Sequence, residues 1–223
     1  MAESLSSPVT TTLSPFRSPR RYLLPAIVLL GWLALVTVVL VADQPVEECW
    51  DRLTENVAAA DGVAVFLTLL VSYHSIGLGL LLLCLLDRRL RWQFMRHAAV
   101  LMLGQAVLCG LIKQLFGRLR PNVAAEATIF YGPSTSFMSF SFPSGHATAA
   151  WTLAGIMSTY YPRWKWLFMI LATAVCLSRV QLDRHFPSDI LAGGLLGWYL
   201  AVWTLKWLRR PAQPEEAPEP AVA

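Results

Sequence analysis

The sequence predicts an all-α membrane protein: a polytopic bundle of six transmembrane helices with both termini in the cytoplasm. The first observation is the composition, since 56% of the 223 residues are hydrophobic and 14% are charged, against about 45–50% and about 25% in soluble domains. The second is a series of six apolar runs, and the third is the uneven distribution of Lys and Arg between the connections. This composition excludes a disordered chain and argues against a soluble one.

The first two apolar runs are long enough to cross a bilayer. Residues 22–42 reach about 31 Å as a helix. Because this run is longer than the apolar part of a cleaved signal peptide, we interpret it as a retained anchor. Residues 62–86 lack formal charge and carry one intramembrane histidine, His74. It has no evident partner nearby in the sequence, and we interpret it as structural.

The four remaining runs are shorter and comprise residues 98–112, 147–161, 166–177 and 190–208. The two runs of 15 residues need flanking residues to span, and the run of 12 residues also suits a buried or re-entrant helix. The last run carries Gly193, Gly194 and Gly197, which suit close contact between helices. We expect one membrane domain over residues 17–210. The Ser/Thr/Pro-rich residues 1–16 and the Pro/Glu-rich residues 211–223 are predicted to be disordered tails.

The distribution of basic residues predicts the orientation. Loops rich in Lys and Arg remain in the cytoplasm. With six spans, twelve of the 18 basic residues fall on the face that holds both termini, whereas the first connection, on the opposite face, is acidic. We therefore expect an integral protein of the bacterial inner (cytoplasmic) membrane, with the second face on the extracytoplasmic side.

Polar residues cluster in three segments that this topology places on the extracytoplasmic face. Residues 113–121 (KQLFGRLRP) end the third span, residues 142–150 (FPSGHATAA) begin the fourth, and residues 178–189 (SRVQLDRHFPSD) join the fifth to the sixth. Because the ends of spans three and five and the starts of spans four and six share one face, the three segments can converge.

The residue types in these segments predict a phosphate site. Ser144 is suited to cap the fourth helix and Pro187 to begin the sixth. Two helix N-termini then offer free backbone N–H groups to an anion. Lys113, Arg120 and Arg179 supply further donors and positive charge, and Arg matches the geometry of phosphate oxygens.

Two histidines in the same segments favour phosphoryl transfer. One of His146 and His185 can attack phosphorus while the other protonates the leaving oxygen. Asp189, four residues after His185, can accept the imidazole N–H and stabilise the imidazolium. The spacing alone leaves open which histidine plays which role.

The ordered set of residues resembles the signature of the type 2 phosphatidic acid phosphatase superfamily. Its three parts are Lys113 with Arg120 and Pro121, the run Pro143, Ser144, Gly145 and His146, and Ser178 and Arg179 with His185 and Asp189. The six spans around residues 113–189 resemble the membrane lipid phosphatases of that superfamily rather than its soluble acid phosphatases or vanadium haloperoxidases. Arg118, Asp183 and Arg184 lie outside the signature and are left unassigned.

The resemblance implies a role for each matched residue. It implies that His185 is the nucleophile and forms a phosphohistidine, that His146 acts as acid and then as base, and that Asp189 is the partner of His185. The implied phosphate ligands are Lys113, Arg120, Ser144, Gly145 and Arg179. It implies no metal; we expect no other cofactor, no nucleic-acid partner, and a lipid phosphate as substrate.

Several substrates and other functions remain open. Undecaprenyl diphosphate, phosphatidylglycerol phosphate, phosphatidic acid and lipid A all present a phosphate at headgroup level, and no specificity motif separates them. A phosphotransferase that moves phosphate from a lipid diphosphate to another lipid would use the same residues. An anion transporter would also gather Arg and Lys. A bis-histidine haem protein and an intramembrane serine protease using Ser144 fit the pattern less well.

Overall fold

The computed structural model describes residues 20–86, 91–123, 130–133 and 140–208. Both predicted tails lie outside these residues. In the described part of the chain there is no β-strand, only two isolated bridges that pair Arg118 with Phe130 and Leu119 with Phe140. The prediction of an all-α fold is confirmed.

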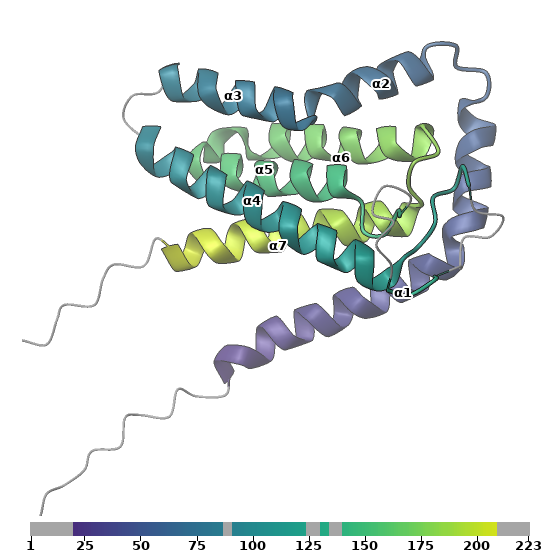
Figure 1. Ribbon diagram of the computed structural model, residues 1–223, viewed down its shortest axis with the longest axis horizontal. Helices are drawn as coiled ribbons and strands as arrows, with labels where there is room; N and C mark the ends of the chain where they lie inside the picture. Colours follow the sequence, from purple (N-terminus) through teal and green to yellow (C-terminus); the bar gives the residue numbers. More distant parts are fainter. Residues whose placement is uncertain (1–19, 87–90, 124–129, 134–139, 209–223) are drawn as a thin grey trace, which may run out of the picture. The chain divides into compact units, whose positions relative to one another are not determined.

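The described residues form seven α-helices, labelled in Figure 1. They are α1 (Arg20–Thr54), α2 (Ala60–Leu70), α3 (Tyr73–Leu86), α4 (Arg91–Phe116), α5 (Gly145–Tyr160), α6 (Lys165–Gln181) and α7 (Pro187–Leu208). A short 3-10 helix, Pro162–Trp164, precedes α6. The chain divides into two units, Met1–Leu35 and Val36–Ala223, and every contact described below lies within the second.

The predicted span over residues 62–86 is a bent pair of helices. The structure breaks this run after Leu70, and the two helical parts are bent by 56°. Serine hydroxyls provide the physical reason. Ser72 Oγ accepts a hydrogen bond from the backbone N–H of Ser75 (3.2 Å), and Ser75 Oγ donates to the carbonyl of Leu69 (2.6 Å). These side chains take up backbone groups that a continuous helix would pair internally.

Two helices are long and apolar enough to cross a membrane, among the residues that the structure describes. They are Trp92–Phe116, within α4, and α7, and the bent pair α2–α3 makes a third if it counts as one span. α5 and α6 have 16 and 17 residues, fewer than the about 20 that a straight span needs. The chain is therefore an integral membrane protein, whereas six spans and cytoplasmic termini remain predictions.

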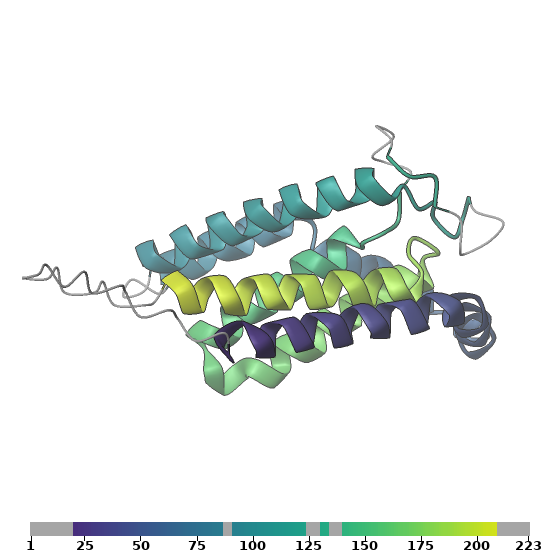
Figure 2. The same ribbon diagram turned by 90° about the horizontal axis from the view of Figure 1, so that it is seen from below.

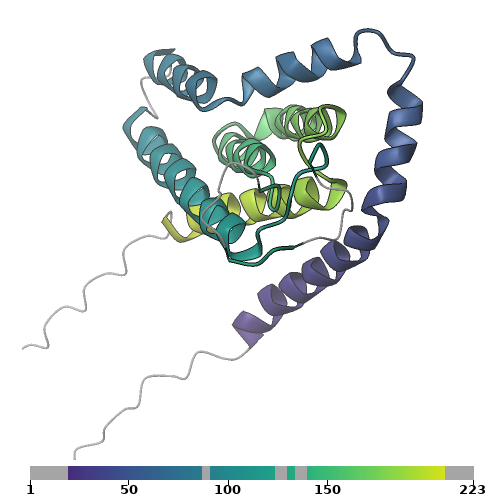
Figure 3. The same ribbon diagram turned by 45° about the vertical axis from the view of Figure 1, so that its right-hand side comes forward.

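α5 is the central helix of the second unit. It packs against α4, α6 and α7, and α2 packs on α6 (Figure 3). An apolar cluster joins α4, α5 and α7 and consists of Phe94, Ala98, Leu101, Ile156, Ala201 and Leu205. The end of α4 and the start of α7 lie at the same end of the unit (Figure 2), which brings the predicted polar segments together.

Candidate active site

The N-terminus of α5 forms one side of the site. The prediction that Ser144 caps this helix is confirmed, because its backbone is extended (φ −69°, ψ 116°) and its hydroxyl accepts a hydrogen bond from the N–H of Ala147 (3.4 Å). Gly145 and His146 follow as the first helical residues, both half-buried. The N–H groups of a first helical turn have no partner within the helix and carry partial positive charge.

The N-terminus of α7 lies beside that of α5. Pro187 begins α7 as predicted, and Asp189 Oδ2 accepts a hydrogen bond from the N–H of Phe186 (2.9 Å). The N–H of Ser144 donates to the carbonyl of Asp189 (3.0 Å), which joins the two helix starts directly. The helices approach so closely that a Cβ on Gly193 would lie 2.5 Å from the carbonyl oxygen of Ser144.

Lys113 and Arg179 occupy the last turns of α4 and α6 and are buried. Lys113 Nζ donates to the carbonyl oxygens of Phe140 (2.8 Å) and Ser141 (3.0 Å). Since an ammonium group has three hydrogens, one remains for a ligand among the described contacts. Arg179 Nη1 donates to the hydroxyl of Thr68 on α2 (3.1 Å), so α2 orients this guanidinium.

Arg120 and Arg179 each retain an unused donor. In the described part of the chain, the buried Nε of each has no hydrogen-bond partner. Burial lowers the pKa of Arg120 and the positive charge of Arg184 lowers it further, whereas Asp189 opposes this shift. An anion bound here would supply both the missing acceptors and the missing negative charge.

His185 is buried between α6 and α7. Its Nδ1 lies 3.7 Å from Oδ2 of Asp189, within electrostatic range but longer than a hydrogen bond. Burial lowers the pKa of His185 to about 3, with smaller effects from Asp189, which raises it, and from Lys113 and Arg179, which lower it. The imidazole is therefore neutral at ordinary pH and has a lone pair available for attack.

The three sequence segments converge. His146 lies within electrostatic range of Arg179, Arg120 and Lys113, and His185 lies within the same range of Lys113 and Arg179. The structure thus places the end of α4, the start of α5 and the junction of α6 with α7 around one position. The role of each residue there remains a prediction.

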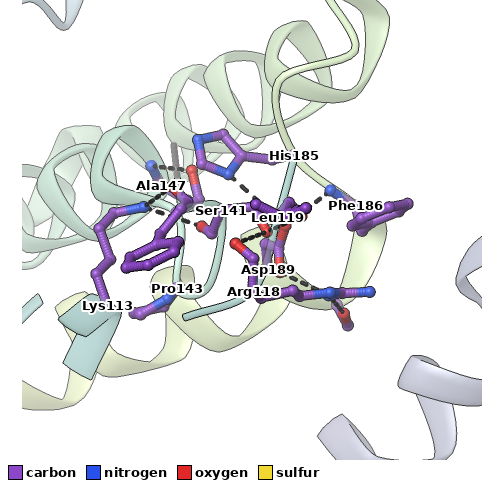
Figure 4. A network of polar contacts seen from close by, with 12 residues as sticks. Lys113, Arg118, Leu119, Ser141, Pro143, Ala147, His185, Phe186 and Asp189 are labelled. Carbon is purple, nitrogen blue, oxygen red and sulfur yellow. Dashed lines mark hydrogen bonds and ion pairs between the residues drawn. The ribbon is translucent and has the colours of Figure 1, made fainter. Parts of the chain in front are cut away.

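Arg118 is a component of the site that the sequence reasoning left unassigned. It is fully buried, as are Asp43, Ser188 and Asp189. Its Nη1 donates to Asp189 Oδ1 (2.6 Å) and to Ser188 Oγ (2.7 Å), and its Nη2 donates to Asp43 Oδ2 (2.6 Å). Its guanidinium carbon lies 4.1 Å from the centre of the Phe186 ring. Figure 4 shows the carboxylate of Asp189 between Arg118 and His185.

Asp43 reaches this network from α1. Its carboxylate accepts hydrogen bonds from the N–H of Ser188 (2.8 Å) and from Ser188 Oγ (2.5 Å). An anionic acceptor at the first turn of α7 already complements the partial positive charge of that helix end. The prediction that the start of α7 offers free N–H groups to an anion is therefore wrong, because Pro187 has no N–H and those of Ser188 and Asp189 donate to Asp43 and to the carbonyl of Phe186. The sequence reasoning counted Asp43 only as one of the acidic residues of the first connection.

An apolar cavity begins about one helical turn from the polar site. It has a volume of about 400 Å³ and lies between α2, α3, α5 and α6. Its lining is largely aliphatic and includes Ala150, one turn after His146, and Val175, one turn before Arg179. The nearest lining residues are thus about one helical turn from two residues of the polar site.

Comparison with known proteins places the same segments in one family. The family model of the PAP2 superfamily matches residues 93–212, a range that contains all three polar segments. The lipid A 1-phosphatase of Rhizobium johnstonii is 31% identical over 100 residues, which make up 44% of this chain and 41% of that protein. The undecaprenyl-diphosphatase of Sulfolobus acidocaldarius is 34% identical over 96 residues, which make up 43% of this chain and 46% of that protein.

The fold also matches a solved structure. A crystal structure of a PAP2-type phosphatidylglycerolphosphate phosphatase from Bacillus subtilis has a TM-score of 0.59 and 19% sequence identity, and the match covers 82% of this chain and 98% of that one. At this level of identity the likeness shows a shared fold. The matched residues make up less than half the length of each of these two curated relatives.

Proposed function

The chain belongs to the PAP2 superfamily, and we propose that it is a membrane-embedded phosphatase that removes phosphate from a lipid phosphate or diphosphate. The observation that carries this proposal is the N-terminus of α5 beside buried cations with unused donors. The bond from the N–H of Ser144 to the carbonyl of Asp189 holds the start of α5 beside the junction of α6 with α7, and the Nε atoms of Arg120 and Arg179, unpaired among the described residues, support an anion site. A helix N-terminus and guanidinium groups together favour phosphate.

Phosphoryl transfer proceeds in two steps in this proposal. His185 attacks phosphorus, the bond from phosphorus to the lipid oxygen breaks, and His146 gives its proton to the departing oxygen. His146 then takes a proton from water, which attacks the phosphohistidine and releases inorganic phosphate and neutral His185. The neutral ring of His185 has the lone pair that a nucleophile requires, and the division of roles between the two histidines rests on the resemblance.

A lipid substrate accounts for the apolar cavity. Its lining includes residues one helical turn from His146 and Arg179. We therefore place the hydrocarbon chain of the lipid toward this cavity when the cations hold its phosphate. A phosphate group and a hydrocarbon chain are combined in undecaprenyl diphosphate, phosphatidylglycerol phosphate, phosphatidic acid and lipid A. We place the site that binds them on the extracytoplasmic face of the bacterial inner membrane.

Release of inorganic phosphate by the purified protein in detergent tests the proposal. We expect release from at least one of these four lipids and none from His185→Ala, with lipid acceptors added to detect transfer to a second lipid. Phosphate release from none of them, together with accumulation of labelled phosphate in proteoliposomes, would favour an anion transporter instead.

The proposed reaction needs no divalent ion, because Lys113, Arg120 and Arg179 supply the positive charge at phosphorus. Among the described residues, no three His, Cys, Asp or Glu side chains are gathered as a candidate metal site. We expect full phosphatase activity in EDTA. Loss of activity in EDTA that Mg²⁺ or Zn²⁺ restores would contradict this prediction.

A further inference from the structure

The two oxygens of the Asp189 carboxylate have different partners. Oδ1 accepts from Arg118 Nη1 (2.6 Å), whereas Oδ2 accepts from the N–H of Phe186 (2.9 Å) and lies 3.7 Å from His185 Nδ1. A carboxylate oxygen has two acceptor sites, so Oδ2 can take one more hydrogen bond. The oxygen that lies 3.7 Å from the imidazole is thus not the one that accepts from Arg118.

Arg118 contacts one oxygen of Asp189 because its other end is held elsewhere. Its Nη2 donates to Asp43, and its backbone carbonyl accepts from the N–H of Ser141 (2.7 Å). An Arg with both Nη groups directed at one carboxylate forms a bidentate pair that uses both oxygens. By holding Nη2, Asp43 keeps the guanidinium from adopting that pairing and leaves Oδ2 available to His185.

Because Arg118 and its two carboxylate partners are buried, the loss of one partner is expected to move the others. Arg118, Asp43 and Asp189 are all fully buried, and charged groups out of water interact strongly and tolerate little misplacement. If Asp43 is removed, the guanidinium loses a charged partner, and Asp189 is the remaining carboxylate among its described contacts. The expected rearrangement draws Oδ2 toward Arg118 and away from His185.

We infer that Asp43 and Arg118 are positioning residues for the reaction, which orient the carboxylate of Asp189 so that Oδ2 faces Nδ1 of His185. The inference rests on the proposed function, because it assigns these residues to the same site. Asp43 and Arg118 act through Asp189 on the ring that attacks phosphorus. The network therefore extends the site to α1.

Steady-state kinetics of Asp43→Ala provide the first test. In metal sites, removal of a residue that orients a ligand typically costs about 10- to 100-fold. By the same orienting effect we expect kcat to fall by about tenfold or more. KM for the lipid and inhibition by vanadate should change less than about twofold, since the phosphate ligands remain. Arg118→Lys keeps the positive charge but loses the planar pair of Nη donors that contact Asp43 and Asp189, so it should also reduce kcat.

The matched control is Asp51→Ala, the same substitution two turns later on α1, where the side chain is exposed. Its kcat should equal that of the native protein. If Asp43→Ala is not recovered folded, Asp43→Asn keeps the side-chain volume and should change kcat in the same direction. Unchanged kcat in a folded variant would overturn the inference. A loss of kcat/KM that comes wholly from a higher KM, with an equal rise in the inhibition constant of vanadate, would overturn it too.

A spectroscopic measurement separates this inference from the proposed function. In protein labelled with ¹⁵N-histidine, the Nδ1 resonance of His185, assigned with His185→Gln, reports its contact with Asp189. We expect it to shift in Asp43→Ala and to remain in place in Asp51→Ala. This measurement does not require turnover. If the native protein hydrolyses no lipid, the proposed phosphatase function is refuted, and the resonance still tests whether Asp43 positions Asp189. An unmoved resonance in Asp43→Ala would overturn that role.

Discussion

The neutral, buried imidazole of His185 has a consequence for stability. Its pKa is lowered to about 3 in the folded protein, against about 6.5 in an unfolded chain. Between these values the unfolded chain binds a proton that the folded protein does not, so this contribution to stability is present above pH 6.5 and is lost as the pH falls toward 3. The slope is about 1.4 kcal/mol per pH unit.

We therefore predict that the free energy of unfolding of the native protein in detergent falls more steeply from pH 6.5 to pH 4 than that of His185→Gln. The difference between the two curves isolates this residue from other groups that titrate in the same range, such as Glu47, whose pKa burial raises to about 7. Parallel curves would show that the His185 ring is protonated in the folded protein.

The two histidines can be separated by the basicity of the leaving group. A general acid typically contributes about 10²- to 10⁴-fold and matters most when the departing oxygen is strongly basic, whereas a nucleophile is required for every substrate. We predict that His185→Ala is inactive on all substrates. His146→Ala should retain more of its relative rate on p-nitrophenyl phosphate than on an alkyl lipid phosphate.

The measurement for this prediction is the single-turnover rate of leaving-group release. If His146 also activates water in the second step, slow hydrolysis of the phosphohistidine would hide the difference in steady state. A burst of p-nitrophenol from His185→Ala, or equal losses on both substrates in His146→Ala, would contradict the assignment.

Sequence reasoning identified the residues of the convergent segments but missed the contacts behind them. Ser144 and Pro187 could be recognised because capping depends on neighbouring residues, which the sequence displays directly. The contact of Arg118 with Asp43 joins residues 75 positions apart, and no local pattern encodes it. The signal that was available is weak: Arg118 stands two positions before Arg120, and Asp43 follows directly after an apolar run.

At the scale of the helices, the contact of α5 with α7 controls the geometry of the site. A Cβ on Gly193 would lie 2.5 Å from the carbonyl oxygen of Ser144 and 2.9 Å from Thr148 Oγ1, so the helices would have to separate where their N-termini meet. Overpacking typically costs about 1–3 kcal/mol. We predict that Gly193→Ala lowers thermal stability and kcat/KM for the lipid.

Gly104→Ala on α4 is the matched control, because no heavy atom lies within 4 Å of a Cβ built there. It should match the native protein in a thermal unfolding assay and in phosphate release. Equal behaviour of the two variants would show that the close contact of α5 with α7 is not needed at the site.

Apolar runs in the sequence located the helices but not their ends. Helix α4 extends beyond residues 98–112 at both ends, to Arg91 and Phe116, because backbone hydrogen bonds continue a helix through polar residues that end an apolar run. The break between α2 and α3 was missed because two serines within an apolar run resemble ordinary small residues. Their hydrogen bonds to the backbone appear only in three dimensions.

At the scale of the whole molecule, the orientation of the site in the membrane depends on two helices. α4 and α7 both qualify as spans by length and composition. The start of α4, with Arg91 and Arg96, and the end of α7, with Lys206, therefore lie on one side of the bilayer, and Lys113 and Asp189 lie near the other. The ends of α4 and α7 keep this placement whether α5 and α6 are complete spans or shorter helices within the bundle.

Loops rich in Lys and Arg remain in the cytoplasm. With six spans, twelve of the 18 basic residues fall on the face that holds both termini, opposite the site. We predict that the site is extracytoplasmic. An alkaline phosphatase fusion within residues 121–142 should be active and one after residue 210 inactive, because that reporter folds only outside the cytoplasm, where its disulfides can form. The reverse pattern of activity would place the site on the cytoplasmic face and exclude substrates confined to the outer leaflet.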